Sequence, residues 1–98
     1  MIKHIVLWKL SETGKKEGAE KIIEILKVKF DALIGVVDGL KEIEVGLNYN
    51  GEEYDLVLYS VFETKEAEKN YQTHPAHLEV KKIIQRYVEG RACVDYLI

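Results

Sequence analysis

The segment Tyr71–His77 reads Tyr-Gln-Thr-His-Pro-Ala-His and holds the only proline of the chain and two of its three histidines. Proline fits best at the first position of a helix, because its φ is fixed and it has no amide hydrogen. Apolar residues then recur at helical spacing from Val80 to Val88. The sequence therefore predicts a helix that starts at Pro75, with His74 at its N-cap and His77 in its first turn.

Two side chains of this segment, His77 and Tyr71, could take part in catalysis or ligand binding. A histidine in the first turn meets free amides and the positive end of the helix dipole, so it should stay neutral near pH 7. A neutral imidazole can act as a general base or donate a hydrogen bond to a carbonyl, and Tyr71 adds a phenolic hydroxyl nearby. The alternative is that His74 only caps the helix and Tyr71 only fills the core, because caps and buried aromatics are common.

Composition limits the classes of protein that fit. The 98 residues predict one domain, residues 1–98, small enough that oligomerisation would help its stability. A net charge of −3, with lysines mixed among glutamates, argues against a nucleic-acid partner. The single Cys93 allows no internal disulfide, and no stretch approaches the ~20 apolar residues of a membrane span. We expect no membrane partner and a cytoplasmic location.

The periodicity of the chain predicts four strands and three helices. Strands are expected at 2–10, 40–48, 54–62 and 91–98, and helices at 15–34, at 65–71 and from Pro75 to a stop at Gly90. A turn at 11–14 offers Ser11 or Thr13 as a helix cap, and Asn50-Gly51 predicts a hairpin. This order predicts an α+β, ferredoxin-like βαββαβ fold with a four-stranded antiparallel sheet.

The predicted sheet is apolar on both faces, and this pattern predicts that the chain forms an oligomer. Two helices can cover only one face, so a second copy would have to shield the other. Two facing sheets would close a dimeric α/β barrel, and we expect its lumen to be lined by His4, Val6 and Trp8. A pocket beneath the His74–His77 turn is then the expected site for a small-molecule ligand.

Residues at both ends of the chain resemble a known family. They are Lys3–Leu7 followed by Lys9, then Tyr71 and the His74–His77 turn, and the late strand segment Val94–Tyr96. In this order they resemble the stress-responsive dimeric α/β-barrel (Dabb) family over essentially the whole chain. The resemblance implies a ferredoxin-like monomer that pairs into a homodimeric barrel.

The resemblance also implies roles for several residues. In a plant polyketide cyclase of this fold, olivetolic acid cyclase, the catalytic tyrosine and histidine and a pocket histidine match Tyr71, His77 and His4. By this likeness His77 would remove a proton next to a carbonyl, Tyr71 would position the carbonyl oxygen, and His4 would support the pocket. Val6, Trp8 and His74 are the further expected ligand-binding residues.

No cofactor is required by this reading, although some relatives hold a Mg²⁺-like ion on backbone carbonyls after the first helix. The matching carbonyls would be those of Ile34, Val37 and Leu40, and Asp38 stands where the cyclase has a proline.

Three functions remain open from the sequence. The first is an enzyme of the cyclase, lyase or isomerase type, with His77 as base. The second is a non-catalytic, stress-associated dimer that binds a carbonyl-containing or polyketide-like ligand. The third is a zinc site made of His4, His74 and His77, since three histidines satisfy the usual minimum for zinc.

Overall fold

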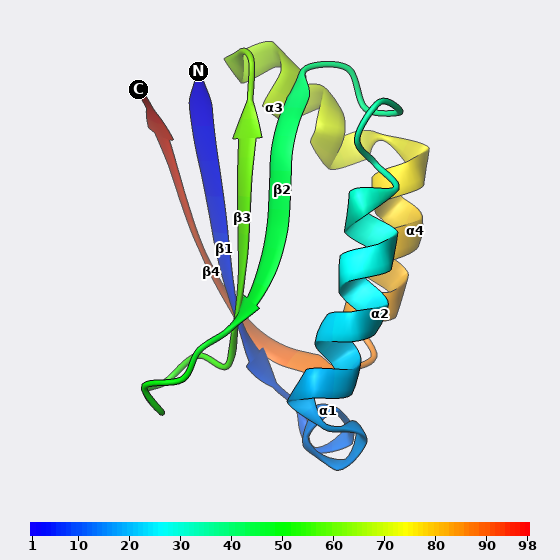
Figure 1. The fold of residues 1–98 in the computed structure, drawn as a ribbon, viewed down its shortest axis with the longest axis vertical. Helices are drawn as coiled ribbons and strands as arrows, with labels where there is room; N and C mark the ends of the chain where they lie inside the picture. The colour runs from blue at the N-terminus through cyan, green and yellow to red at the C-terminus, as the bar shows by residue number, and fades with distance from the viewer.

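The computed structural model describes all residues from Met1 to Ile98 as one antiparallel sheet with helices on one face (Figure 1). The strand order is β2-β3-β1-β4, which is the ferredoxin-like topology expected from the sequence. The elements are β1 (Ile2–Leu10), α1 (Glu12–Glu17), α2 (Ala19–Asp31), β2 (Leu40–Leu47), β3 (Leu56–Phe62), α3 (Lys65–Thr73), α4 (Pro75–Ile84) and β4 (Val88–Leu97). None of the helices combines the length and the hydropathy needed to cross a bilayer.

The first helical region differs from the expected single helix at 15–34. It is divided into α1 and α2 at Gly18, whose φ of 97° lies in the left-handed region that glycine adopts without strain. The expected turn at 11–14 is instead the start of α1. The Ser11 hydroxyl accepts a hydrogen bond from the Gly14 amide at 3.1 Å, so of the two predicted caps, Ser11 and Thr13, it is Ser11 that caps the helix.

The end of the last helix also differs from the prediction. Helix α4 ends at Ile84, and β4 already begins at Val88, so Gly90 lies inside a strand and is not a helix stop. The carbonyl of Tyr87 accepts a hydrogen bond from the Ser11 amide at 2.8 Å, which fixes the chain beside the end of β1 before β4 starts. This long-range contact ends the helix earlier than the local sequence indicates.

The two faces of β1 have different partners. Its even-numbered residues, which include His4, Val6 and Trp8, are buried beneath the helices, and the Trp8 ring stacks on Phe30 of α2. The expectation that these three residues line a lumen between two sheets is therefore wrong. Both faces of β1 are apolar, so the alternation alone could not show which face the helices cover.

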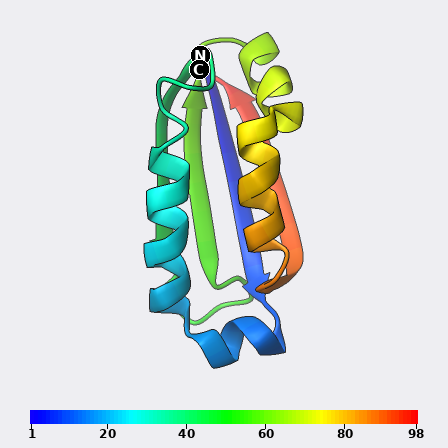
Figure 2. The ribbon, with the colours of Figure 1, turned by 90° about the vertical axis from the view of Figure 1, so that its right-hand side faces the viewer.

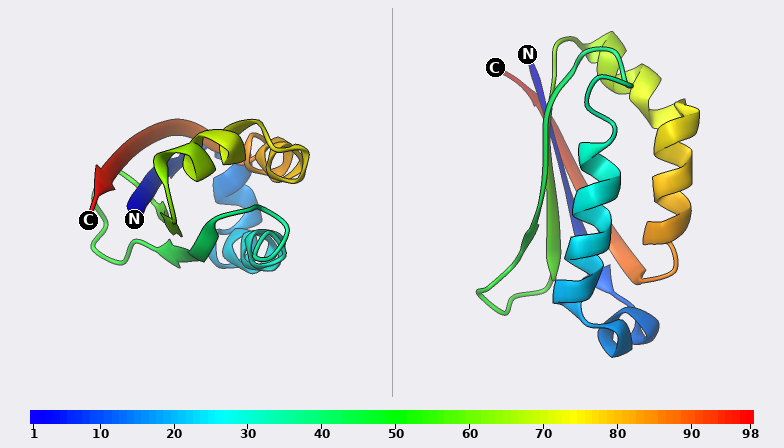
Figure 3. Two further views of the ribbon diagram at one scale, coloured as in Figure 1. Left: turned by 90° about the horizontal axis from the view of Figure 1, so that it is seen from above. Right: turned by 45° about the vertical axis from the view of Figure 1, so that its right-hand side comes forward.

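The helices lie in front of one face of the sheet in Figure 2, and the opposite face has no helix over it (Figures 1 and 3). It carries the alternate residues of the strands, including Ile5 and Tyr59, and two large side chains of the edge strand β4. Those two, Val94 and Tyr96, are 58% and 43% exposed. The single chain therefore presents an apolar sheet surface on the side away from its helices.

Candidate active site

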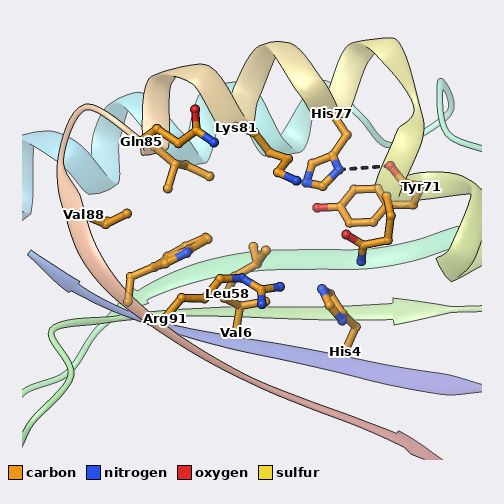
Figure 4. Close-up of a pocket in the computed structure, with 12 residues that line it drawn as sticks. His4, Val6, Leu58, Tyr71, His77, Lys81, Gln85, Val88 and Arg91 are labelled. Atoms are coloured by element: carbon orange, nitrogen blue, oxygen red, sulfur yellow. Dashed lines mark hydrogen bonds between the residues drawn. The ribbon is translucent and has the colours of Figure 1, made fainter.

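A cavity of about 120 Å³ lies between the sheet and the helices α3 and α4 (Figure 4). Its size is close to the ~150 Å³ of an engineered cavity that binds benzene, so it can enclose a small organic ligand. The expected residues His4, Val6, Trp8, Tyr71 and His77 all line it. All of its lining residues come from a single chain, and it lies beneath the helices, not in the space between two sheets.

Seven further residues complete the lining of the cavity. They were not predicted from the sequence as site residues, and they are Leu58, Gln72, Lys81, Ile84, Gln85, Val88 and Arg91. Lys81 on α4 and Gln85, the C-cap of that helix, follow His77 at intervals of four residues, and this spacing could have identified them. Arg91 could be found only once the register of β4 against β1 was known.

The turn between α3 and α4 positions His77. Pro75 occupies the first position of α4, and Nδ1 of His74 accepts a hydrogen bond from the Ala76 amide at 3.1 Å. His74 is thus the predicted N-cap, and it does not line the cavity. The structure therefore does not bring His74 together with the expected ligand-binding residues, nor with His4 and His77 as a three-histidine zinc site.

The His77 imidazole is held in one tautomer. Its Nδ1 lies 3.0 Å from the backbone oxygen of Tyr71, and because that oxygen can only accept, Nδ1 is the atom that carries the proton. Nε2 is then the nitrogen with the free lone pair. The pKa of His77 is lowered to about 4, chiefly by burial; the hydrogen bond to the Tyr71 carbonyl opposes this shift, and the nearby Lys81 charge adds to it. His77 is neutral at pH 7, as expected, although burial rather than its place at the helix start is the main cause.

Tyr71 packs directly against this imidazole. The two rings stack with centroids 3.8 Å apart, and Tyr71 is completely buried. Its hydroxyl has no hydrogen-bonding partner among the groups of the protein and points into the cavity (Figure 4). Burial raises the pKa of Tyr71 well above its usual range, so the hydroxyl keeps its proton and can donate it to a ligand.

His4 is oriented from the edge strand. Its Nδ1 contacts the carboxylate of Asp95, which is the residue directly opposite it on β4. Because a carboxylate accepts, Nδ1 of a neutral His4 carries the proton and Nε2 is left free. Cys93 lies beside this pair, with Sγ 3.7 Å from Nδ1 of His4 and 3.5 Å from Asp95. The ligand atoms of His4, Cys93 and Asp95 lie within 4.8 Å of one another. These three residues are therefore a group whose side chains could bind a metal ion.

The loop after α2 gives little support to the Mg²⁺ site implied by the resemblance. Of the three matching carbonyls, that of Val37 already accepts a hydrogen bond from the Leu40 amide at 3.3 Å, and Ile34 lies at the surface. Three neutral carbonyls bring no charge, whereas Mg²⁺ in proteins is normally bound through one or two carboxylates. The residues do not fit such an ion well.

A ferredoxin-like domain with a histidine- and tyrosine-lined cavity under its helices is the class of protein that this fold and site define. Residues 2–98 match the model of the family described as Stress responsive A/B Barrel Domain, and the chain belongs to this family.

Two solved structures and one protein sequence are similar to this chain. A dimeric protein of unknown function with a ferredoxin-like fold from Bacteroides fragilis is 40% identical, with a TM-score of 0.86 over 99% of this chain and 95% of that one. The stress-response A/B barrel domain-containing protein HS1 of Arabidopsis thaliana is 30% identical over 101 residues, which cover 97% of this chain and 87% of HS1. A hydroxynitrile lyase from Passiflora edulis is 18% identical with a TM-score of 0.77 over 99% of this chain and 92% of its own, a likeness of fold alone.

Proposed function

We propose that the cavity binds a small carbonyl compound and that His77 removes a proton from the carbon next to the carbonyl. Tyr71 would donate a hydrogen bond to the carbonyl oxygen. The observation that carries this proposal is the neutral His77 imidazole stacked on Tyr71, whose buried hydroxyl has no partner within the protein. A base and a hydrogen-bond donor side by side in one cavity are the two groups that enolisation requires.

The chemistry of the step follows from these two groups. The electron pair of the C–H bond moves to the carbonyl oxygen, and the proton moves to Nε2 of His77. Tyr71 donates to the oxygen as its negative charge develops, which lowers the barrier most when the donor is already in place. Because the Nδ1 proton of His77 is bonded to the Tyr71 carbonyl, the imidazolium that forms is stabilised where it stands. The enolate can then be reprotonated elsewhere or attack a second carbonyl, as in an isomerase or an aldol cyclase.

The pKa of His77 limits the substrate. A base whose pKa is about 4 is weak, so it suits a carbon acid that is unusually acidic, such as a CH₂ between two carbonyls. The enolate itself would then favour the protonated imidazole beside it. His4, oriented by Asp95, would support the far wall of the cavity as a positioning residue.

The size of the cavity limits how much of a polyketide-like ligand it could hold. About 120 Å³ can hold the reacting end of a polyketide-like chain, but the rest of a long chain would have to extend through the opening. The proposed similarity of mechanism to olivetolic acid cyclase rests on three residues alone, Tyr71, His77 and His4.

A second candidate is a binding protein without turnover, and the low basicity of His77 favours it. In that case Tyr71 would donate to a bound carbonyl or carboxylate, and no proton would leave the ligand.

We further propose that the chain is a homodimer, joined through the helix-free face of the sheet. The exposed Val94 and Tyr96 on that face, and the dimeric state of the 40%-identical relative from Bacteroides fragilis, support this assembly. Dimers of this kind bury apolar sheet surface that a monomer would expose to water.

Deuterium exchange tests the proposed chemistry. Methyl acetoacetate is incubated in D₂O with the protein, and exchange of its CH₂ protons is followed by NMR after the buffer rate is subtracted. We expect the wild type to accelerate exchange and His77→Gln to slow it by about a hundredfold or more, the usual effect of a general base. Tyr49→Phe, at a tyrosine 96% exposed, is the control and should have no effect. Exchange at the buffer rate together with measurable binding would favour the second candidate.

A further inference from the structure

The charges around the cavity do not match those of the rest of the chain. The chain has 17 acidic and 14 basic residues and a net charge of −3. The residues that line the cavity nevertheless include two cations, Lys81 and Arg91, and no aspartate or glutamate. The lining side chains thus carry net positive charge on a protein that is acidic overall, and the carboxylate that contacts this lining is that of Asp95, on His4.

Neither of these cations is neutralised by a carboxylate. The lysine–carboxylate pairs of the structure involve Lys15, Lys21, Lys41 and Lys82, and neither Lys81 nor Arg91 forms one. The contrast on α4 is direct, because Lys82 is paired with Glu79 at 3.1 Å on the solvent side. Lys81, one residue earlier, runs along the helix toward the ring of His77 (Figure 4).

The two cations come from opposite walls of the cavity. Lys81 belongs to α4 and Arg91 to β4, and Arg91 extends into the space between that strand and the helix (Figure 4). Both cations lie close enough to affect the reacting pair: the Lys81 charge lowers the pKa of His77, and the Arg91 charge lowers that of Tyr71 against a larger opposing effect of Glu68. An anion placed between them would lie next to both proposed functional groups.

We infer that the ligand of this cavity is an anion, a small carbonyl compound with a carboxylate that Lys81 and Arg91 hold together. This inference rests on the proposed function and names its substrate class. The carbonyl oxygen would take the free hydrogen bond of Tyr71 while the carboxylate lies between the ammonium and guanidinium groups. Acetoacetate has both groups, with an acidic carbon between them, and its seven non-hydrogen atoms compare with the six of benzene.

Three variants and three probes test this assignment. The probes are acetoacetate, its uncharged methyl ester and inorganic phosphate, and their binding is measured by NMR titration of ¹⁵N-labelled protein at fixed ionic strength. Lys81→Met and Arg91→Met each remove a charge and keep much of the apolar stem. Lys82→Met is the matched control, because it removes a lysine of the same helix that does not face the cavity.

We expect the wild type to bind acetoacetate more tightly than the methyl ester. Lys81→Met and Arg91→Met should each weaken acetoacetate binding by about tenfold or more, as for a lost charge-assisted hydrogen bond, and leave binding of the ester nearly unchanged. Lys82→Met should change neither. Phosphate that competes with acetoacetate, and loses affinity in the same two variants, would support the anion site and assign it to phosphate-bearing ligands if phosphate binds more tightly.

Equal affinities for acetoacetate and the ester in the wild type would overturn the inference. So would equal losses in Lys81→Met and Lys82→Met, because the effect would then be one of overall charge. The proposed function fails separately: preserved anion binding without accelerated exchange would refute proton abstraction and leave the anion site standing. Accelerated exchange of the ester without any preference for the anion would refute the anion site and leave the proposed proton abstraction standing.

Discussion

The stability of the fold should fall as the pH drops from 7 to 4, and His77 should be a main cause. Burial holds the pKa of His77 at about 4 in the folded protein, against 6.5 for an unperturbed histidine. Between these values the unfolded chain binds a proton that the folded chain does not, so acid favours unfolding. The contribution of His77 is complete above pH 6.5 and is lost as the pH falls to 4, below which both states are protonated.

The size of this effect follows from the two pKa values. Their difference of about 2.5 corresponds to at most about 3 kcal/mol at 1.36 kcal/mol for each pKa unit. Between pH 7 and pH 5 the linkage relation gives a loss of about 2 kcal/mol. This is a large share of the ~5–15 kcal/mol that stabilises a domain of this kind.

Urea unfolding of the wild type and of His77→Gln at both pH values measures the effect. The only tryptophan, Trp8, is buried against Phe30 and reports unfolding by its fluorescence. Glutamine can still donate a hydrogen bond to the Tyr71 carbonyl but does not titrate. The wild type should therefore lose about 2 kcal/mol more than the variant between pH 7 and pH 5, since contributions from other groups cancel in the difference.

Equal losses in the two proteins would refute the reasoning. His77 would then have an ordinary pKa in the folded state, and the neutral base on which the proposed chemistry depends would not be assured at the lower end of the physiological range.

Three other changes have defined outcomes. Tyr71→Phe removes a buried hydroxyl without a protein partner, so it should raise the free energy of unfolding by about 1 kcal/mol and slow exchange of methyl acetoacetate; a loss of stability relative to Tyr49→Phe would contradict this. Partial burial, and then the charge of Asp95, raise the pKa of Cys93; iodoacetamide should therefore alkylate it slowly at pH 7, and Asp95→Asn should speed the reaction, as mass spectrometry will show. Val94→Lys places a charge on the helix-free face and should convert the dimer to a monomer in light scattering, whereas an unchanged mass would exclude this face as the interface.

The parts of the structure that the sequence predicted depend on short-range patterns. The proline at the start of α4, its His74 cap, the Ser11 cap and the order of the elements all follow from neighbouring residues. The division of the first helix could have been predicted from Gly18, because glycine permits the left-handed backbone found there.

The parts that could not be predicted depend on strand register and on the face that the helices cover. His4 meets Asp95 only because β1 and β4 pair antiparallel in one register, and a shift of one residue would turn Asp95 to the other face. Likewise, the cavity lies beneath the helices because His4, Val6 and Trp8 face them, a choice that two apolar faces leave undecided. Tyr71 and His77, which are six residues apart and joined by a local hydrogen bond, could be paired from the sequence.

The edge strand β4 links the proposed dimer to the cavity. It is the least buried strand of the sheet, and it pairs only with β1. On the face of β4 that points toward the helices, Arg91 lines the cavity and Asp95 contacts His4. On its other face, Val94 and Tyr96 are exposed in the single chain. A partner packed on the outward residues would hold the strand, and with it the guanidinium and the carboxylate, in place. Although one chain supplies every lining residue of the cavity, we therefore expect Val94→Lys to weaken acetoacetate binding without altering any group that touches the ligand.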